Sequence, residues 1–208
     1  MRKIIRKSVA TLLLIASVGS AEAAGIDYSN AAFAPSGSPT SVPLGHYEFC
    51  KTHVADCRLN EPIVEAVSLT SENWEELLAV DNNVNAAVRP VSDEDLYQVA
   101  EYWAYPQGAG DCEDFVLEKR RALVQSGWPA STLLIAVVRK QDGEGHAVLL
   151  VRTDRGDLVL DNLDGEIHVW NETPYSYLKR QDQADSASWV DLRDDRTILV
   201  ASMHDPVR

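Results

Sequence analysis

The hydrophobic pattern of the chain changes near residue 127. Before it, apolar side chains recur at the three- and four-residue spacing of helices; after it, they form short continuous runs typical of buried strands. Helices first and strands second predict an α+β domain in which N-terminal helices pack on an antiparallel β-sheet. The strands are expected over residues 132–138, 146–152, 158–163, 166–170 and 196–203.

Three helices are expected in the first half of the chain. The first, over residues 61–80, has apolar residues at helical spacing, and Thr70 or Ser71 can cap the start of its second half. Residues 81–89 can extend this helix until Pro90 breaks it. A glycine-containing loop, YPQGAG, precedes the third helix, which Gly127 ends. The three helices are expected over residues 61–80, 92–103 and 111–126.

Residues 1–23 have the layout of a secretory signal peptide. Four basic residues open the chain, an apolar run follows over residues 9–18, and small residues form an A-x-A site at residues 21–23. The alternative is an uncleaved membrane anchor, but the apolar run has about 10 residues, whereas roughly 20 are needed to span a bilayer. We therefore expect export to the periplasm or secretion, and a mature chain without a transmembrane segment.

The mature chain is expected to comprise an extended arm over residues 24–45 and one domain over residues 46–208. Its length is sufficient for a single domain with a hydrophobic core. The net charge is −13, and loss of the signal peptide, with four basic residues and one acidic residue, takes it to −16. Such a charge disfavours nucleic acid and anionic lipid as partners. We expect a monomer.

The chain has three cysteines: Cys50, Cys57 and Cys112. In an oxidising compartment exposed thiols tend to pair, and Cys50 and Cys57 are close enough in sequence to close a small disulfide loop. Cys112 is then left over. An odd cysteine in an exported protein is either a reactive thiol or a buried core thiol.

The surroundings of Cys112 favour the reactive thiol. Cys112 follows the segment GAGD and opens the third expected helix. The N-terminus of a helix carries partial positive charge and free backbone N–H groups, which stabilise a thiolate and can hold an oxyanion. The glycines would let a substrate backbone approach closely.

A thiol nucleophile needs a base, and the base needs an orienting acceptor. Of the five histidines, His146 is best placed, because it begins a strand at the rim of the sheet; the alternative is an ordinary hydrogen-bonded histidine. If Arg152 pairs with Asp157 across the next hairpin, Asp161 stands opposite Val148, on the same face as His146. A hairpin loop with an odd number of residues, or a bulge, would break this argument; the alternative is that Asp161 begins a turn, since Asp-Asn is typical of turns.

Acidic residues flank the candidate nucleophile. Asp111 has the position of an N-cap, and Asp114 three residues later resembles a capping box, while Glu113 suits the first turn of a helix. The same negative charges disfavour a thiolate, and a bound Ca²⁺ held by these carboxylates would offset them. Capping and calcium binding therefore both remain open from these residues alone.

Several blocks of the chain together resemble one protein family. GDCEDF, HAVL and LVLDN occur in this order, with matching segments VNAAVRP, DEDLYQ, GWPASTLLIAVV and IHVW around them. The chain from about Cys50 thus resembles the bacterial transglutaminase-like cysteine peptidases, the LapG-related periplasmic cysteine proteases. The arm and the FCKTHVADC segment lie outside this pattern, so an adhesin substrate and control by a cyclic di-GMP receptor are not carried over.

The resemblance implies a papain-like, transglutaminase-like core and a Cys112–His146–Asp161 triad. It implies calcium at Asp111 and Glu113, with Asp114 as a third position. The expected function is an endopeptidase that cleaves periplasmic or cell-surface proteins through a thioester intermediate, with Gln107 as a candidate oxyanion donor. The alternatives are acyl transfer by a transglutaminase or amidase with the same triad, and a non-catalytic binding module on this fold.

Overall fold

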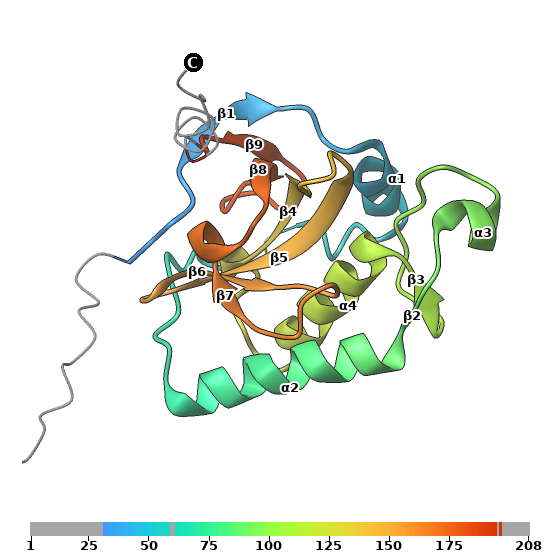
Figure 1. Ribbon diagram of the computed structural model, residues 1–208. Coiled ribbons are helices and arrows are strands. Elements are labelled where there is room, and N and C mark those ends of the chain that lie inside the picture. Colours follow the sequence, from blue (N-terminus) through green and yellow to red (C-terminus); the bar gives the residue numbers. More distant parts are fainter. Residues whose placement is uncertain (1–30, 59–60, 195, 197–208) are drawn as a thin grey trace, which may run out of the picture.

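The protein is an α+β structure in which helices cover one face of a seven-stranded antiparallel sheet (Figure 1). The computed structural model describes residues 31–58, 61–194 and 196. The sheet has the order β1-β9-β8-β4-β5-β6-β7. Its strands are β1 (Ser36–Thr40), β4 (Leu133–Arg139), β5 (Gly145–Thr153), β6 (Gly156–Leu160), β7 (His168–Val169), β8 (Ser176–Gln181) and β9 (Trp189–Leu192). The sequence prediction of helices on an antiparallel sheet is confirmed.

The helices precede the central strands in the chain. A two-stranded parallel ribbon, β2 with β3, links the helical segments beside the sheet. The helices are α1 (Leu44–Thr52), α2 (Ser71–Ala87), α3 (Asp93–Tyr97) and α4 (Cys112–Gln125); the ribbon strands are β2 (Arg89–Pro90) and β3 (Ala109–Gly110); short 3-10 turns are η1 (Ala130–Thr132) and η2 (Trp170–Glu172). None of the helices among the described residues combines the length and apolar character needed to cross a bilayer.

The first expected helix is wrong in its first half. Helix α2 begins at Ser71, and the Thr70 side chain caps it by accepting a hydrogen bond from the Asn73 N–H at 3.1 Å. Residues 61–69 instead run beside the sheet, where Val67 exchanges backbone hydrogen bonds with Arg152 and Asp154. Val67 and Leu69 of this segment pack against the core on the helical face of the sheet, whereas Ile63 is exposed.

The second expected helix is shorter than expected. Helix α3 spans only Asp93–Tyr97, because Gln98 adopts a left-handed conformation with φ of 60° and ends it. Ser92 caps its start by accepting from the Asp95 N–H at 3.3 Å.

The expected central strands are present, but the edges of the sheet were missed. Strand β6 ends one residue before Asp161, and β7 has only two residues. Strands β1, β8 and β9 were not expected, because they are short or polar and lack a clear alternation. The last expected strand lies outside the described residues beyond Arg196.

Two apolar clusters pack on the two faces of the sheet. On the helical face, side chains of α1, α2 and α4 meet odd-numbered positions of β5 such as Leu149. On the other face, even-numbered positions such as Val148 pack with Trp170 and Tyr177. The two central strands, β4 and β5, are almost fully buried, so the sheet is a rigid support for groups at its ends.

The register of the β5–β6 hairpin matches the sequence prediction. Arg152 lies opposite Asp157, and Leu149 lies opposite Leu160. One further step along the same register brings Asp161 opposite Val148, two residues from His146. The hairpin therefore carries His146 and Asp161 to the same end of the sheet.

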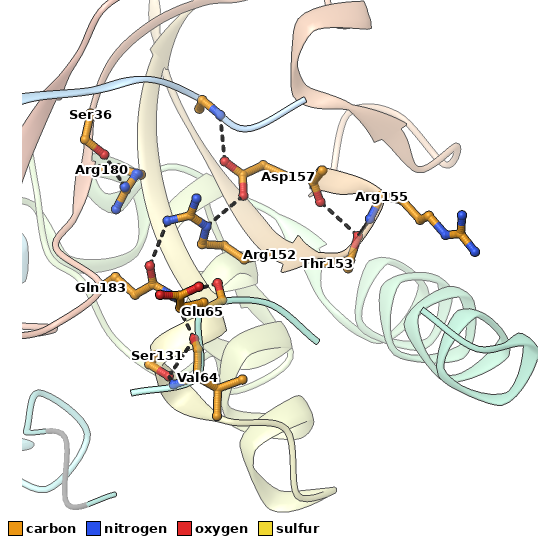
Figure 2. Close-up of polar contacts among 12 residues, drawn as sticks. Ser36, Val64, Glu65, Ser131, Arg152, Thr153, Arg155, Asp157, Arg180 and Gln183 are labelled. Atoms are coloured by element: carbon orange, nitrogen blue, oxygen red, sulfur yellow. Dashed lines mark hydrogen bonds and ion pairs between the residues drawn. The ribbon is translucent and has the colours of Figure 1, made fainter. Parts of the chain in front are cut away.

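Polar contacts secure the opposite end of this hairpin (Figure 2). Asp157 forms an ion pair with Arg152, whose guanidinium also donates to Gln183 at 2.7 Å. Gln183 in turn donates to the Val64 carbonyl at 2.7 Å. The other Asp157 oxygen accepts from the Ala34 N–H at 2.8 Å. The hairpin is thus tied to the N-terminal arm, to the β8–β9 loop and to the segment before α2.

A buried ion pair joins α2 to α4. Lys119 Nζ lies 2.6 Å from Asp81 Oδ1, and the two side chains are 0% and 1% exposed. Burial lowers the pKa of Lys119 and raises that of Asp81, while the attraction between the two charges opposes both shifts. Among the described residues, neither Lys119 nor Asp81 forms another ion pair, so the two charges depend on each other and hold α2 against α4.

We expect Lys119→Met to lower the free energy of unfolding by about 3–5 kcal/mol, because it leaves the Asp81 carboxylate buried without a cation. The double variant Lys119→Met/Asp81→Leu should regain most of that loss, since an apolar pair of similar volume removes the stranded charge. Urea unfolding of the three proteins measures both changes. If Lys119→Met is as stable as the wild type, the ion pair with Asp81 does not hold the two helices together.

Candidate active site

Cys112 is the first residue of α4 and is partly buried. Its thiol donates a hydrogen bond to Glu113 Oε2 at 3.0 Å. Burial raises the pKa of the thiol well above its ordinary value, and the charge and hydrogen bond of Glu113 add to this, while the backbone of Ala147 acts in the opposite direction. The thiol therefore lies near the β5 backbone at Ala147, and its acidic neighbour Glu113 favours the neutral form.

His146 and Asp161 form a buried pair at the rim of the sheet. His146 Nε2 lies 2.7 Å from Asp161 Oδ1, and the two side chains are 3% and 2% exposed. Because a carboxylate only accepts, Nε2 carries the hydrogen and the other ring nitrogen, Nδ1, is the basic one. Among the hydrogen bonds of the described residues, none joins His146 to Cys112.

Asp161 is held from several sides. Its Oδ1 also accepts from the Leu163 N–H at 3.0 Å, and its Oδ2 accepts from the Tyr175 hydroxyl at 2.5 Å. Asn85 of α2 donates to its backbone carbonyl at 2.8 Å. Burial pushes the pKa of Asp161 upward, but its bonds and attraction to His146 and the Tyr175 bond outweigh this, so the pKa lies below its ordinary value.

Three carboxylates converge beside the thiol: Asp93, Asp111 and Glu113. Their oxygens lie within 4.8 Å of one another, the arrangement of a possible metal site. The Oδ1 atoms of Asp93 and Asp111 are buried and have no hydrogen-bond partner among the described residues. Oxygen ligands from grouped carboxylates are what Ca²⁺ prefers, so these residues fit such an ion. A second cluster, around His46, has both of its sulfurs in a disulfide.

The capping interpretation of the flanking acids fails. Asp111 occupies the N-cap position, but its side chain makes no capping hydrogen bond and instead accepts from the Asp93 N–H at 3.3 Å. Asp114 Oδ1 accepts from the Ala104 N–H at 2.8 Å, and its carboxylate lies against Gly110, just before the helix begins. Gly110 makes room for it, because a Cβ at residue 110 would lie 2.4 Å from Asp114 Oδ2.

The buried acids are poorly compensated in the protein alone. Burial raises the pKa of Asp111, and burial together with the Asp111 charge raises that of Glu113. Burial is also the main cause that raises the pKa of Asp114 to about 7 and that of Asp93 to about 6. Carboxyl groups gathered this closely disfavour simultaneous ionisation, and a cation removes that penalty.

The other expected site residues are placed as follows. Cys50 and Cys57 form a disulfide with a Cα–Cα distance of 5.7 Å, which ties α1 to the turn after it. Gln107 is exposed in the loop before β3, and Asp114 lies outside the three-carboxylate group. Residues 1–23, the expected signal peptide, lie outside the described residues.

The sequence matches a family model over residues 36–197: Peptidase_C93, the bacterial transglutaminase-like cysteine proteinases (BTLCP). The chain belongs to this family. The resemblance to the transglutaminase-like cysteine peptidases seen in the sequence is confirmed. No curated protein matches the chain.

Solved structures of LapG from Legionella pneumophila are similar to this chain. The calcium-bound form is 24% identical, with a TM-score of 0.47, and the match covers 52% of this chain and 65% of that one, just under two thirds of its length. The EGTA-treated form is 22% identical with a TM-score of 0.48, covering 60% and 73%. A third LapG structure is 23% identical with a TM-score of 0.47, covering 62% and 74%.

Three residues of the site were not expected from the sequence. Asp93 belongs to the acidic segment DEDLYQ, but nothing there distinguishes it from its acidic neighbours. Asn85 belongs to the matching segment VNAAVRP, but nothing there marks it as a partner of Asp161, and Tyr175 comes from a segment with no recognisable motif. Each is brought to the site by tertiary packing, since Asp93 is 18 residues from Asp111 and Asn85 is 76 residues from Asp161.

We expect the free energy of unfolding to fall as the pH rises from about 4 to about 7 when a chelator is present. Over this range the folded protein keeps protons on Asp93 and Asp114 that the unfolded chain, with ordinary carboxyl pKa values, releases. Urea unfolding at about pH 5 and about pH 8 measures the slope.

Asp114→Asn should make this slope shallower, whereas Asp142→Asn, at an exposed site, should leave it unchanged. If the wild type has the same free energy of unfolding at both pH values, the protonation of Asp93 and Asp114 does not contribute to stability.

Proposed function

We propose that the chain is an exported endopeptidase that cleaves periplasmic or cell-surface proteins, with Cys112, His146 and Asp161 as its catalytic triad. The observation that carries the proposal is the buried hydrogen bond of 2.7 Å between His146 and Asp161, next to the strand backbone that the Cys112 thiol meets. An imidazole oriented by a carboxylate beside a thiol is the arrangement that nucleophilic catalysis requires.

In the first half of the reaction, Cys112 Sγ attacks the carbonyl carbon of the scissile amide while its proton passes to His146 Nδ1. Asp161 keeps the imidazole in the required tautomer and stabilises the imidazolium. The negative charge that develops on the carbonyl oxygen falls near the free N–H groups of the first turn of α4, with Gln107 from the preceding loop as a further donor.

In the second half, the imidazolium returns its proton to the leaving amine, the C–N bond breaks, and an acyl-thioester remains on Cys112. His146 then takes a proton from water, whose oxygen attacks the thioester. The thiol leaves with that proton, and the carboxylic acid is released. The same thioester would pass its acyl group to an amine in a transglutaminase or amidase.

Glu113 couples the nucleophile to the carboxylate group. It accepts the Cys112 hydrogen bond and also belongs to the three acids that converge beside α4. We propose that Asp93, Asp111 and Glu113 hold a calcium ion, with Asp114 adjacent to them. Such an ion would supply the positive charge that offsets the acids around the thiol.

Export is supported by two features. The N-terminal residues have the layout of a signal peptide, and the Cys50–Cys57 disulfide suits an oxidising compartment. We propose that the mature chain has an arm over residues 24–45 and a peptidase domain over residues 46–208, and acts as a monomer.

We expect the mature chain, with calcium, to generate new protein termini in an extract of envelope proteins, as read by N-terminal labelling and mass spectrometry. His146→Ala should lower the rate by at least about 10³-fold, because the general base is lost. His168→Ala, which removes a half-buried histidine paired with Asp164, is the matched control and should cleave as the wild type does.

Cys112→Ala provides the background. New termini that persist in Cys112→Ala would contradict the peptidase proposal. Cross-linked or amine-labelled products in place of new termini would favour the acyl-transfer alternative, and neither product from the wild type would favour a binding module.

We expect Ca²⁺ to raise the melting temperature of the wild type and to bind it in calorimetry. Asp93→Asn should weaken this binding by about tenfold or more, because it removes one anionic oxygen ligand. Glu94→Gln is the matched control: it removes a neighbouring exposed acid of α3 that is not in the cluster. Equal calcium binding by Asp93→Asn and the wild type would rule out this ligand set.

A further inference from the structure

Asp161 is the acid of the proposed triad, and its carboxylate is buried away from water. Its side chain is 2% exposed, so both carboxylate oxygens need partners from the protein. Oδ1 has two, the imidazole of His146 and the backbone N–H of Leu163. The partner of Oδ2 is the hydroxyl of Tyr175, at 2.5 Å.

We propose that Tyr175 is a positioning residue: its hydroxyl holds the second oxygen of Asp161 so that the first is aimed at His146 Nε2. This inference rests on the proposed catalytic function. A carboxylate fastened through one oxygen can rotate about its χ2 bond, which is a soft torsion. Hydrogen bonds to both oxygens stop that rotation, and the imidazole plane is then fixed in turn.

The tyrosine ring also covers the pair. The ring centroids of Tyr175 and His146 are 5.5 Å apart, with the planes tilted by 58°. Tyr175 and Asp161 both line a cavity of about 240 Å³ that is open on one side and bounded by Thr173 and Pro174. Tyr175 therefore packs beside the imidazole and lines the same cavity as the acid.

The backbone that carries Tyr175 is itself anchored. Arg196 donates from Nη2 to the Tyr175 carbonyl at 2.8 Å and from Nη1 to the Thr173 carbonyl at 3.2 Å. Its Nε pairs with Asp194 at 2.8 Å. The hydroxyl is thus presented from an anchored turn before β8, a part of the chain distinct from the β5–β6 hairpin and the loop after it, which supply His146 and Asp161.

The other charged groups around Asp161 do not replace this contact. Lys119 of α4 attracts Asp161 electrostatically but is bound to Asp81 of α2, which lies close enough to Asp161 for the two charges to repel. Asp164, in the same loop as Asp161, is also negative. Burial raises the pKa of Tyr175, and the bond and charge of Asp161 and then the charge of Asp164 add to this. With acids on two sides, the hydroxyl is the group that stabilises the charge on Oδ2.

The test is Tyr175→Phe, which removes the hydroxyl and keeps the ring. The Asp161 carboxyl loses one of the bonds that keep its pKa low, so the midpoint of its ¹³C signal should rise by about one pH unit. The signal is assigned by its absence in Asp161→Asn, and the measurement is made on the full mature chain with calcium. The low-field proton between His146 and Asp161 should broaden or shift.

Tyr177→Phe is the matched control. Tyr177 is a buried tyrosine of the adjoining strand, and its hydroxyl bonds to Thr173 at 3.1 Å and not to the acid. It should leave the Asp161 midpoint and the low-field proton unchanged. If Tyr175→Phe also leaves both unchanged, Tyr175 is not a positioning residue.

Peptidase kinetics complete the test and separate the two proposals. Tyr175→Phe should lower kcat by about tenfold with little change in KM, and the acid limb of the pH–rate profile should move to higher pH. A loss of activity with an unchanged pH profile would mean that the residue is merely structural. If the wild type cleaves nothing, the proposed function fails, while the carbon and proton signals still decide whether Tyr175 positions Asp161.

Discussion

The hydrogen-bond register between β5 and β6 is the constraint on which the site depends. A strand alternates its side chains between two faces, so a shift of one residue would send Asp161 to the face opposite His146. The register is secured far from the chemistry, by the pairing of Arg152 with Asp157 and by their contacts with the arm and the β8–β9 loop. The contacts at one end of the hairpin thus fix the relative positions of His146 and Asp161 at the other end.

Two opposing electrostatic influences act on the Cys112 thiol at the N-terminus of α4. The helix end favours a thiolate, but burial and the carboxylate of Glu113 favour the neutral thiol. In the protein alone the second influence prevails. In the proposed peptidase, this arrangement keeps the Cys112 thiol protonated until a cation offsets the charge of the neighbouring acids. Glu113 connects the two, because it bonds to the thiol and belongs to the acid group.

The sequence predicted the central features well because they are local. Continuous apolar runs indicated β4, β5 and β6, and the glycine-rich segment before Cys112 indicated the start of α4. It failed where tertiary contacts override local pattern. Residues 61–69 have helical spacing but lie beside the sheet, and Asp111 has the position of a cap but turns its carboxylate toward α3.

By itself, the sequence determined the family, the order of helices and strands, and the parity that relates His146 to Asp161, because each follows from neighbouring residues or from a motif. Only the tertiary structure decided that Asp93 joins Asp111 and Glu113, that Asp114 points elsewhere, and that Tyr175 and Asn85 hold Asp161. These contacts join segments far apart in the chain. Their geometry depends on how α2, α3 and the turn before β8 pack around the sheet, and no local pattern encodes that packing.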